Sequence, residues 1–442
     1  MKPFRILPVL AALVSLAGCT FPSGDDLLAA PKASANYQSL QLELETLLSS
    51  GVTYTAPSGG ENRSAVQLVD LNGDGTDEAI AFFRGASSVT SNEFTVYFYK
   101  KQEDKYVCTG SVGGQATEIE SVEYPVITPD GRRGMVIAWR LPGDGVSGLT
   151  MCDFDADCAP GLLLESEYSA MRLTDLTGDG AKDLLLISVN PAGQRVARLY
   201  QYGAELKLVG EAATSAEAVS VERMHTGRVQ EELPAVFAEQ KTVGGVGLTT
   251  DIFVYTGGQL VNLALDSEDS ITRGTYRPVS VYAADVNADG ITEFPRAVLM
   301  AGYTDPAAAD ALFMLDWYRY SPVAAPELVR TTYQNVADGW SLTIDPEWHD
   351  IITASKRSEN GLSAVEFAQY SGGTRRALFT VYCASGAARD YYDERDDLLR
   401  LGQTAKAVYF ARIAENAQRG AIRVDEQELH DRFSIIRQDW SS

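Results

Sequence analysis

Three short stretches of the chain carry acidic, amide or hydroxyl side chains at alternating positions. They are DLNGDGTDE (70–78), DLTGDGAKD (175–183) and DVNADGITE (285–293). All three follow the pattern D-x-[NT]-x-D-G-x-x-[DE], in which the side chains at positions 1, 3 and 5 of a tight loop can turn the same way and converge. Calcium in proteins takes about six to eight oxygen ligands from carboxylates, amides and backbone carbonyls. The spacing therefore predicts three calcium-binding loops.

The expected ligands stand at positions 1, 3, 5, 7 and 9 of each loop, and position 7 contributes its backbone carbonyl. In the first loop they are Asp70, Asn72, Asp74, Thr76 and Glu78. In the second loop they are Asp175, Thr177, Asp179, Ala181 and Asp183. In the third loop they are Asp285, Asn287, Asp289, Ile291 and Glu293. The alternative is an Asx-rich turn without metal, and Thr177 is a poorer ligand than Asn, so the second site is expected to be the weakest.

Gly75, Gly180 and Gly290 occupy position 6, where the chain must turn sharply, and a positive φ is expected there. Alternating apolar and polar residues flank each loop, which indicates strands on both sides. An EF-hand would instead have flanking helices and a Glu at loop position 12. A similar stretch, CDFDADC (152–158), lacks Gly at position 6 and an acid at position 9, so an exposed hairpin turn is expected.

The spacing of the loops predicts further repeats between them. The loops begin at residues 70, 175 and 285, which are 105 and 110 residues apart, whereas a four-stranded propeller blade needs about 40–50 residues. Each interval is therefore expected to hold one degenerate, metal-free repeat, near 122–139 and 221–239. His225 falls in the second of these and is expected to be exposed in a loop.

The N-terminus has the pattern of a targeting signal. Lys2 and Arg5 precede an apolar run that is too short to cross a bilayer as a helix. The run ends in LAGC, which resembles the lipobox of bacterial lipoproteins and implies that Cys19 is the lipidated first residue of the mature chain. Residues 1–19 are then the signal peptide and 20–35 a tether. A plain signal peptide or a buried core segment is the alternative.

Together, the loops between strands and the lipobox resemble the FG-GAP/VCBS repeats of integrin-type β-propellers, as they occur in bacterial VCBS-repeat lipoproteins. The resemblance implies structural calcium in up to three sites. The expected fold is mainly β: a six- or seven-bladed β-propeller over 36–332 with a smaller C-terminal α+β domain over 333–442. The expected location is the outer face of the bacterial cytoplasmic membrane or the cell envelope, anchored through the lipid on Cys19.

The ends of the chain have patterns of their own. Leucines over 36–50, followed by Gly51, predict a helix. Strands are expected at 339–348, 362–370, 377–384 and 407–414. Asp425 and Glu428 form a capping-box pattern, which predicts a final helix with an apolar face that continues to Ile436.

The net charge and the absence of catalytic motifs from the sequence limit the classes of function to be expected. The formal net charge of −23 disfavours nucleic acid as a partner and suits divalent cations. The sequence has no GxSxG, HExxH, Walker A or SxxK motif, so it is not expected to be an enzyme. The expected function is a membrane-anchored, extracytoplasmic binding or scaffolding module for a protein or glycan partner at the cell surface. The alternatives are a surface hydrolase or lyase acting on glycan or cell wall, and a purely structural envelope protein.

Four cysteines follow Cys19 in the sequence. Whether Cys152 and Cys158 form a disulfide is left open.

Overall fold

The computed structural model describes residues 35–85, 92–103, 105–143, 147–245, 247–265, 272–321, 324–394, 398–415 and 417–436. None of the helices in these ranges is long and apolar enough to cross a bilayer. The chain divides into two compact units. The first contains residues 1–116 and 154–160, and the second contains residues 117–153 and 161–442.

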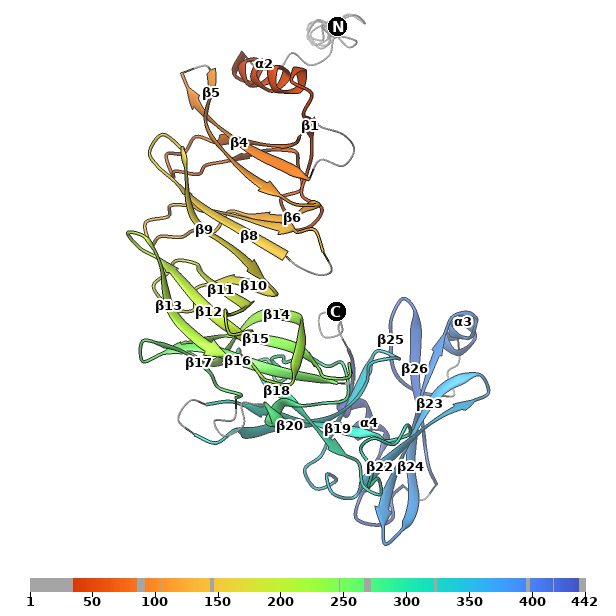
Figure 1. Ribbon diagram of the computed structural model, residues 1–442. Coiled ribbons are helices and arrows are strands. Elements are labelled where there is room, and N and C mark those ends of the chain that lie inside the picture. Colours follow the sequence, from red (N-terminus) through yellow and green to blue (C-terminus); the bar gives the residue numbers. More distant parts are fainter. Residues whose placement is uncertain are drawn as a thin grey trace, which may run out of the picture. The chain divides into compact units, whose positions relative to one another are not determined.

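The first unit is one antiparallel sheet with one helix. Its elements are α2 (Ala35–Ser49), β1 (Thr53–Tyr54), β2 (Val66–Val69), β3 (Glu78–Arg84), β4 (Glu93–Gln102) and β5 (Lys105–Gln115). Both β1 and β2 pair with β3, which continues to β4 and β5 (Figure 1). Leu40 and Leu44 of α2 are buried against Ala79 and Phe83 of β3. The helix expected here is thus confirmed.

The second unit begins with three four-stranded antiparallel sheets. The first has β6 (Glu118–Glu123), β7 (Met135–Arg140), β8 (Ser147–Phe154) and β9 (Pro160–Tyr168). The second has β10 (Ala170–Thr174), β11 (Asp183–Val189), β12 (Arg195–Tyr202) and β13 (Leu206–Ala213). The third has β14 (Ala218–Gln230), β15 (Leu233–Thr242), β16 (Leu248–Thr256) and β17 (Gln259–Asn262), and the 3-10 helix η1 (Arg273–Thr275) follows it.

Two five-stranded sheets complete the second unit. One has β18 (Phe294–Leu299), β19 (Phe313–Arg319), β20 (Glu327–Asn335), β21 (Trp340–Ile344) and β27 (Phe433–Ile435). The other has β22 (Ile352–Glu359), β23 (Leu362–Ser371), β24 (Thr374–Ser385), β26 (Ala407–Ile413) and β25 (Leu399–Gln403). The helices are α3 (Ala387–Asp393) and α4 (Glu426–Arg432).

Apolar clusters join consecutive sheets of the second unit. Met151 of β8 shares a core with Leu186 of β11, and residues of β11 and β12 share another with β15 and β16. A third cluster joins β15 and β16 to Phe294 of β18. The largest contains Trp340 of β21 and Phe367 of β23. Consecutive sheets of the second unit therefore bury apolar faces against each other.

A mainly β fold is confirmed, with six antiparallel sheets among the described residues. These residues do not show the sheets closed into a ring. The strands expected after 339 are present as β21, β23, β24 and β26. The predicted domain boundary at 333 lies inside β20.

The end of the final helix was predicted wrongly. Asp425 caps α4 as expected, because its side chain accepts a hydrogen bond from the Glu428 N–H. The helix stops at Arg432, however, and Phe433–Ile435 form β27. Pairing of Phe433 with Leu342 of β21 adds a strand to a sheet that is already formed. Tertiary pairing therefore overrides the helical periodicity of the apolar residues.

Candidate cation-binding loops

The three acidic loops occupy equivalent places in three different sheets. The loop 70–78 joins β2 to β3, and the loop 175–183 joins β10 to β11. The loop 285–293 precedes β18 and is closed at its base by a bridge between Ala284 and Glu293. The acid at position 9, here called the closing acid, is the first residue of the outgoing strand in the first two loops and directly precedes β18 in the third. The repeat seen in the sequence therefore corresponds to a repeat in structure.

The aspartate at position 1 organises the backbone of each loop. In the first loop, Asp70 Oδ1 accepts a hydrogen bond from the Gly73 N–H at 2.7 Å, and Oδ2 accepts one from the Gly75 N–H at 2.9 Å. Gly73 and Gly75 both have positive φ, 81° and 83°. Asp175 and Asp285 accept equivalent bonds from positions 4 to 6 of their loops, from Gly178, Asp179 and Gly180 and from Asp289 and Gly290. The positive φ expected at position 6 is confirmed in all three loops.

Positions 3 and 5 are coupled to each other. In the first loop, Asn72 Oδ1 accepts the Asp74 N–H at 2.9 Å, and Asn72 Nδ2 donates to Asp74 Oδ2 at 3.0 Å. Asp74 Oδ1 also accepts the Thr76 N–H at 2.8 Å. The hydrogen bond from Asn72, followed by that from Thr76, holds the pKa of Asp74 below its ordinary value. Asp74 is thus an exposed carboxylate that stays ionised.

The closing acids are buried. Glu78 is only 1% exposed, and its Oε2 accepts the Leu71 N–H at 3.0 Å. Its Oε1 has no hydrogen-bond partner among the described residues. Burial raises the pKa of Glu78, against the opposing effect of the Leu71 N–H and of the neighbouring Cys158 thiol. A buried carboxylate oxygen without a partner is unfavourable, so this atom needs a proton, a cation or a donor such as the neighbouring Cys158 thiol.

The closing acid of the second loop is better satisfied. Asp183 Oδ2 accepts the N–H groups of Leu176 and Thr177, both at 2.8 Å, and the Thr177 hydroxyl lies 3.2 Å from Oδ1. Burial nevertheless raises the pKa of Asp183 to about 6. Thr177 thus bonds to the closing acid.

The third loop already contains a cation. Arg319 of β19 forms ion pairs with Asp289 and with Glu293, the latter between Nη2 and Oε1 at 3.2 Å. Glu293 Oε2 accepts the Val286 N–H at 3.1 Å. Burial raises the pKa of Glu293, although the Val286 N–H and Arg319 oppose this. Both oxygens of this closing acid have partners, in contrast to Glu78.

The fit of a metal ion therefore differs between the loops. Within the described part of the chain, no three or more His, Cys, Asp or Glu side chains are grouped as they would be around a metal ion. The position-1 and position-5 carboxylates accept bonds from their own loop backbones instead. The orphan oxygen of Glu78 fits a cation at the first loop, and the oxygen donors of the second loop are compatible with one. At the third loop, the guanidinium of Arg319 already supplies a positive charge, so this loop does not fit a further cation.

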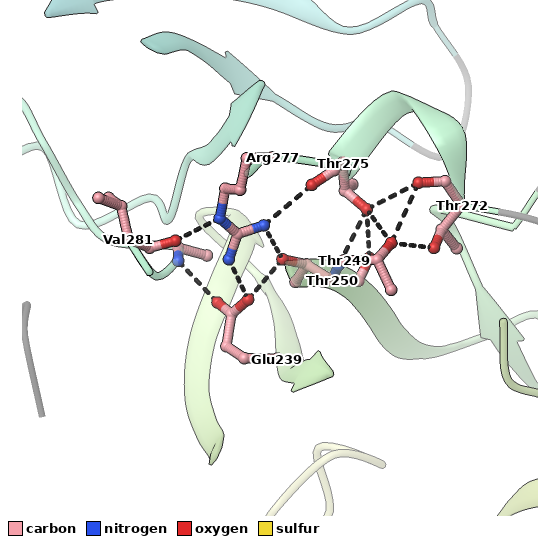
Figure 2. Close-up of polar contacts among 8 residues, drawn as sticks. Glu239, Thr249, Thr250, Thr272, Thr275, Arg277 and Val281 are labelled. Carbon is pink, nitrogen blue, oxygen red and sulfur yellow. Dashed lines mark hydrogen bonds and ion pairs between the residues drawn. The ribbon is translucent and has the colours of Figure 1, made fainter. Parts of the chain in front are cut away.

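A buried polar cluster fixes the segment that leads into the third loop, and the sequence did not indicate it (Figure 2). Arg277 and Glu239 are both fully buried, with Nη2 and Oε2 2.5 Å apart. Glu239 also accepts the Thr250 hydroxyl at 2.6 Å and the Ala283 N–H at 2.7 Å. Arg277 Nε donates to the Val281 carbonyl. The cluster thus ties β15 and β16 to residues 277–283, immediately before Asp285.

Other sequence-based expectations have mixed outcomes. His225 is not in an exposed loop: it lies in β14 and stacks on Phe237 with ring centroids 5.3 Å apart, because the repeat there forms a tight hairpin with β15. Burial accordingly lowers the pKa of His225.

The turn at 155–158 is a hairpin between β8 and β9, as expected, although Cys158 in it is buried. The cysteines of the described ranges are free thiols. The predicted lipidation site, Cys19, lies outside the described residues.

Comparison with known proteins adds little. No family model and no curated protein matches the sequence. Solved structures that match include an exotype rhamnogalacturonan lyase, with TM-score 0.26, 10% identity, and coverage of 74% of this chain and 65% of the lyase. The chain thus spans less than two thirds of the length of that lyase.

Two further matches are of the same quality. An exo-β-1,3-galactanase from Phanerochaete chrysosporium has TM-score 0.25 and 11% identity, with coverage of 76% of this chain and 80% of the galactanase. A mannose phosphorylase from Leishmania mexicana has TM-score 0.18 and 10% identity, with coverage of 78% and 92%. These TM-scores are too low for the matches to carry an argument about fold or activity.

Proposed function

We propose that this chain is a membrane-anchored, extracytoplasmic calcium-binding module of the FG-GAP/VCBS propeller type, which binds or scaffolds a protein or glycan partner at the cell surface. The lipid on Cys19 would be the anchor, and the five antiparallel sheets from β1 to β21 would be blades of the propeller, one fewer than the smaller number expected from the sequence. The last sheet, β22 to β26, and α3 would belong to the smaller C-terminal domain, because the expected boundary at 333 falls within β20. The proposal rests on the lipobox-like N-terminus together with three loops of one geometry in three different sheets.

The observation that carries the calcium part is the buried Oε1 atom of Glu78, which has no hydrogen-bond partner. In the first loop, Asp70, Asn72, Asp74, the Thr76 carbonyl and Glu78 would hold the ion. Calcium would neutralise most of the charge of three carboxylates and link the start of β3 to the loop tip. Such a link stiffens the connection between two strands, which is a structural role and requires no turnover.

A thermal melt of the full chain tests the calcium part. Sites of this extracellular kind bind with dissociation constants on the order of 10⁻⁴–10⁻³ M, so calcium at several millimolar is the appropriate concentration. Binding only to the folded state adds RT ln(1 + [L]/Kd), or about 1–2 kcal/mol per site under these conditions. We expect a higher Tm in calcium than in chelator. Equal melting temperatures, with no calcium retained in elemental analysis, would remove calcium from the proposal.

Binding of a partner needs a separate test. Full chain in calcium is applied to a glycan array and to an envelope extract, and any ligand found is titrated with and without chelator. Saturable binding of one glycan or one envelope protein that weakens in chelator supports the proposal. Absence of binding in both experiments contradicts it. Release of soluble products from a bound glycan, abolished by changing one carboxylate outside the three loops, would favour the alternative of a hydrolase or lyase.

A further inference from the structure

One position on the neighbouring strand faces the closing acid in all three loops. The strand pairs adjacent to the closing acids are Ala79 with Tyr99, Leu184 with Tyr200, and Phe294 with Tyr318. The next residue on each neighbouring strand, here called the facing residue, is therefore Lys100, Gln201 and Arg319. Directly opposed residues of antiparallel strands project to the same face of the sheet. The three repeats thus place a cation, a neutral amide and a second cation at the same structural position.

In the third loop the facing residue occupies the place where a metal ion would bridge positions 5 and 9. Arg319 Nη2 donates to Asp289 and, at 3.2 Å, to Glu293 Oε1. Glu293 is fully buried. The guanidinium is charged at every relevant pH and cannot leave the site as an ion can. A divalent cation entering this loop would stand beside a fixed positive charge that already binds two of its three carboxylates.

In the second loop the facing residue makes the same contacts without a charge. Gln201 Nε2 donates to Asp179 Oδ2 at 2.9 Å and to Thr177 Oγ1 at 3.1 Å. An amide satisfies hydrogen-bond acceptors but leaves the negative charge of Asp175, Asp179 and Asp183 in place. The side chain can also rotate to present its oxygen. The second loop therefore keeps the charge that attracts a divalent cation.

In the first loop the facing residue is held elsewhere. Lys100 Nζ donates to the Ala156 carbonyl and lies 3.7 Å from Asp157 Oδ1, both in the turn between β8 and β9. The charge of Lys100 also lowers the pKa of Asp74, but by less than the hydrogen bonds of Asn72 and Thr76 do. No ion pair joins Lys100 to Glu78 among the described contacts, and Glu78 Oε1 has no partner. The first loop thus has a buried carboxylate oxygen that its facing residue does not satisfy.

We infer that the facing residue determines which loops take up calcium: Arg319 serves as an internal cation in place of a third ion, so the chain binds two calcium ions, at the first and second loops. This inference rests on the proposed calcium binding. It narrows the expectation of up to three sites to two and assigns to Arg319 the role of an ion substitute.

The chain offers a matched pair of exchanges between loops. Arg319→Gln gives the third loop the facing residue of the second, and Gln201→Arg does the reverse. Calcium bound per full chain is counted by equilibrium dialysis with elemental analysis, and Tm is measured with calcium and with chelator. We expect two ions in the parent, three in R319Q and one in Q201R. R319Q should melt at a lower temperature than the parent in chelator and recover in calcium, because its three carboxylates then have no cation.

Arg319→Lys controls for loss of packing, since it keeps the charge and should leave the count at two. Three ions in the parent, or unchanged counts in both R319Q and Q201R, would overturn this inference but leave calcium binding intact. No ion in any variant would overturn the proposed function as well. Should R319Q not fold even in calcium, Q201R decides the matter. Gln201 is half-buried in β12 and faces a loop whose closing acid accepts two backbone N–H groups, so retention of two ions by Q201R refutes the inference.

Discussion

The guanidinium of Arg277 lies 2.5 Å from the carboxylate of Glu239, and neither side chain is exposed to solvent. Removal of one partner would leave the other as an uncompensated buried charge. We therefore expect Arg277→Met alone and Glu239→Gln alone each to lower the free energy of unfolding, by about 3–5 kcal/mol for the loss of a buried partner. Urea unfolding followed by circular dichroism measures the effect.

A solvent-exposed pair provides the control for this prediction. Lys241 and Glu222 are 2.6 Å apart, but 47% and 32% of their side chains are exposed. Solvent screens such a pair, so Lys241→Met should change stability little. A loss in K241M as large as in R277M would show that burial is not what makes the Arg277–Glu239 pair important.

Glu78→Gln should have opposite effects with and without calcium. The amide has no charge and keeps an oxygen for the Leu71 N–H, so without calcium the variant no longer buries a carboxylate and should be more stable than the parent. In calcium, the same change removes a ligand, so the calcium-induced increase in Tm should shrink. Melts of parent and variant in chelator and in calcium give both values.

Asp155→Ala is the matched control for Glu78→Gln. Asp155 Oδ1 accepts the N–H groups of Asp157 and Ala159 at 2.9 Å, so it supports an Asx-type turn much as Asp70 does. The turn lacks the glycine and the closing acid of the three loops. D155A should therefore lower Tm equally in calcium and in chelator. A calcium-dependent difference would assign an ion to this turn and contradict the sequence-based interpretation of it.

The third loop has a strained position that the other two lack. Ala288 at position 4 has φ 62°, where the first and second loops have Gly73 and Gly178 with φ 81° and 80°. A left-handed conformation costs an L-residue about 1–2 kcal/mol, whereas glycine adopts it freely. Ala288→Gly should thus be stabilising by up to about 1 kcal/mol after the added chain entropy of glycine is subtracted.

The reverse exchange tests the same cause. An added Cβ at Gly73 would meet no atom within 4 Å, so Gly73→Ala introduces backbone strain without a clash. It should lower the free energy of unfolding by up to about 1 kcal/mol, because the smaller chain entropy of the unfolded variant offsets part of the strain. Both variants are measured by urea unfolding in chelator, which separates strain from calcium. Equal stability of G73A and the parent would mean that the conformation at position 4 is not costly in these loops.

The loops could be recognised from sequence because their chemistry is local. Position 1 bonds to positions 4 to 6, and the closing acid bonds to position 2, so the pattern and the geometry share one short segment. The facing residues could not be recognised, because the distance from closing acid to facing residue is 22, 18 and 26 residues in the three repeats. Hairpin length varies between repeats, and only strand register brings Arg319 opposite Glu293. A tyrosine before each facing residue was the available signal.

The errors at His225 and Phe433 have a common cause. The repeat spacing placed His225 in the loop of a degenerate repeat, but β14 extends through it and pairs with β15. The helical spacing of Phe433 and its neighbours suggested that α4 continues, but pairing with β21 gives these residues a strand conformation. In both cases a partner that is distant in sequence decides the local structure. Local propensity identified most strands here because their apolar runs are buried on both sides, as in β11 and β16.

Asp251 should make stability depend on pH. The residue is fully buried, and burial raises its pKa to about 6, against hydrogen bonds from Asn262, Ser215 and Gln240. In the unfolded chain its pKa returns to the ordinary value of 3.8. Between these values the folded state binds more protons than the unfolded state, so the contribution of this group to stability falls as pH rises through about 6. Above that pH the folded protein must keep an ionised carboxylate buried.

Asp251→Asn removes this dependence and keeps a side chain of similar shape. The difference in free energy of unfolding between parent and variant should shift by about 1–2 kcal/mol from pH 5 to pH 7.5, with the parent relatively less stable at the higher pH. Asp310→Asn, at an exposed position, serves as the control and should leave the pH profile of the parent unchanged. A difference between parent and D251N that is constant from pH 5 to pH 7.5 would show that Asp251 has the same pKa in the folded and unfolded chain. The hydrogen bonds of Gln240 and Ser215 would then be strong enough to offset its burial completely.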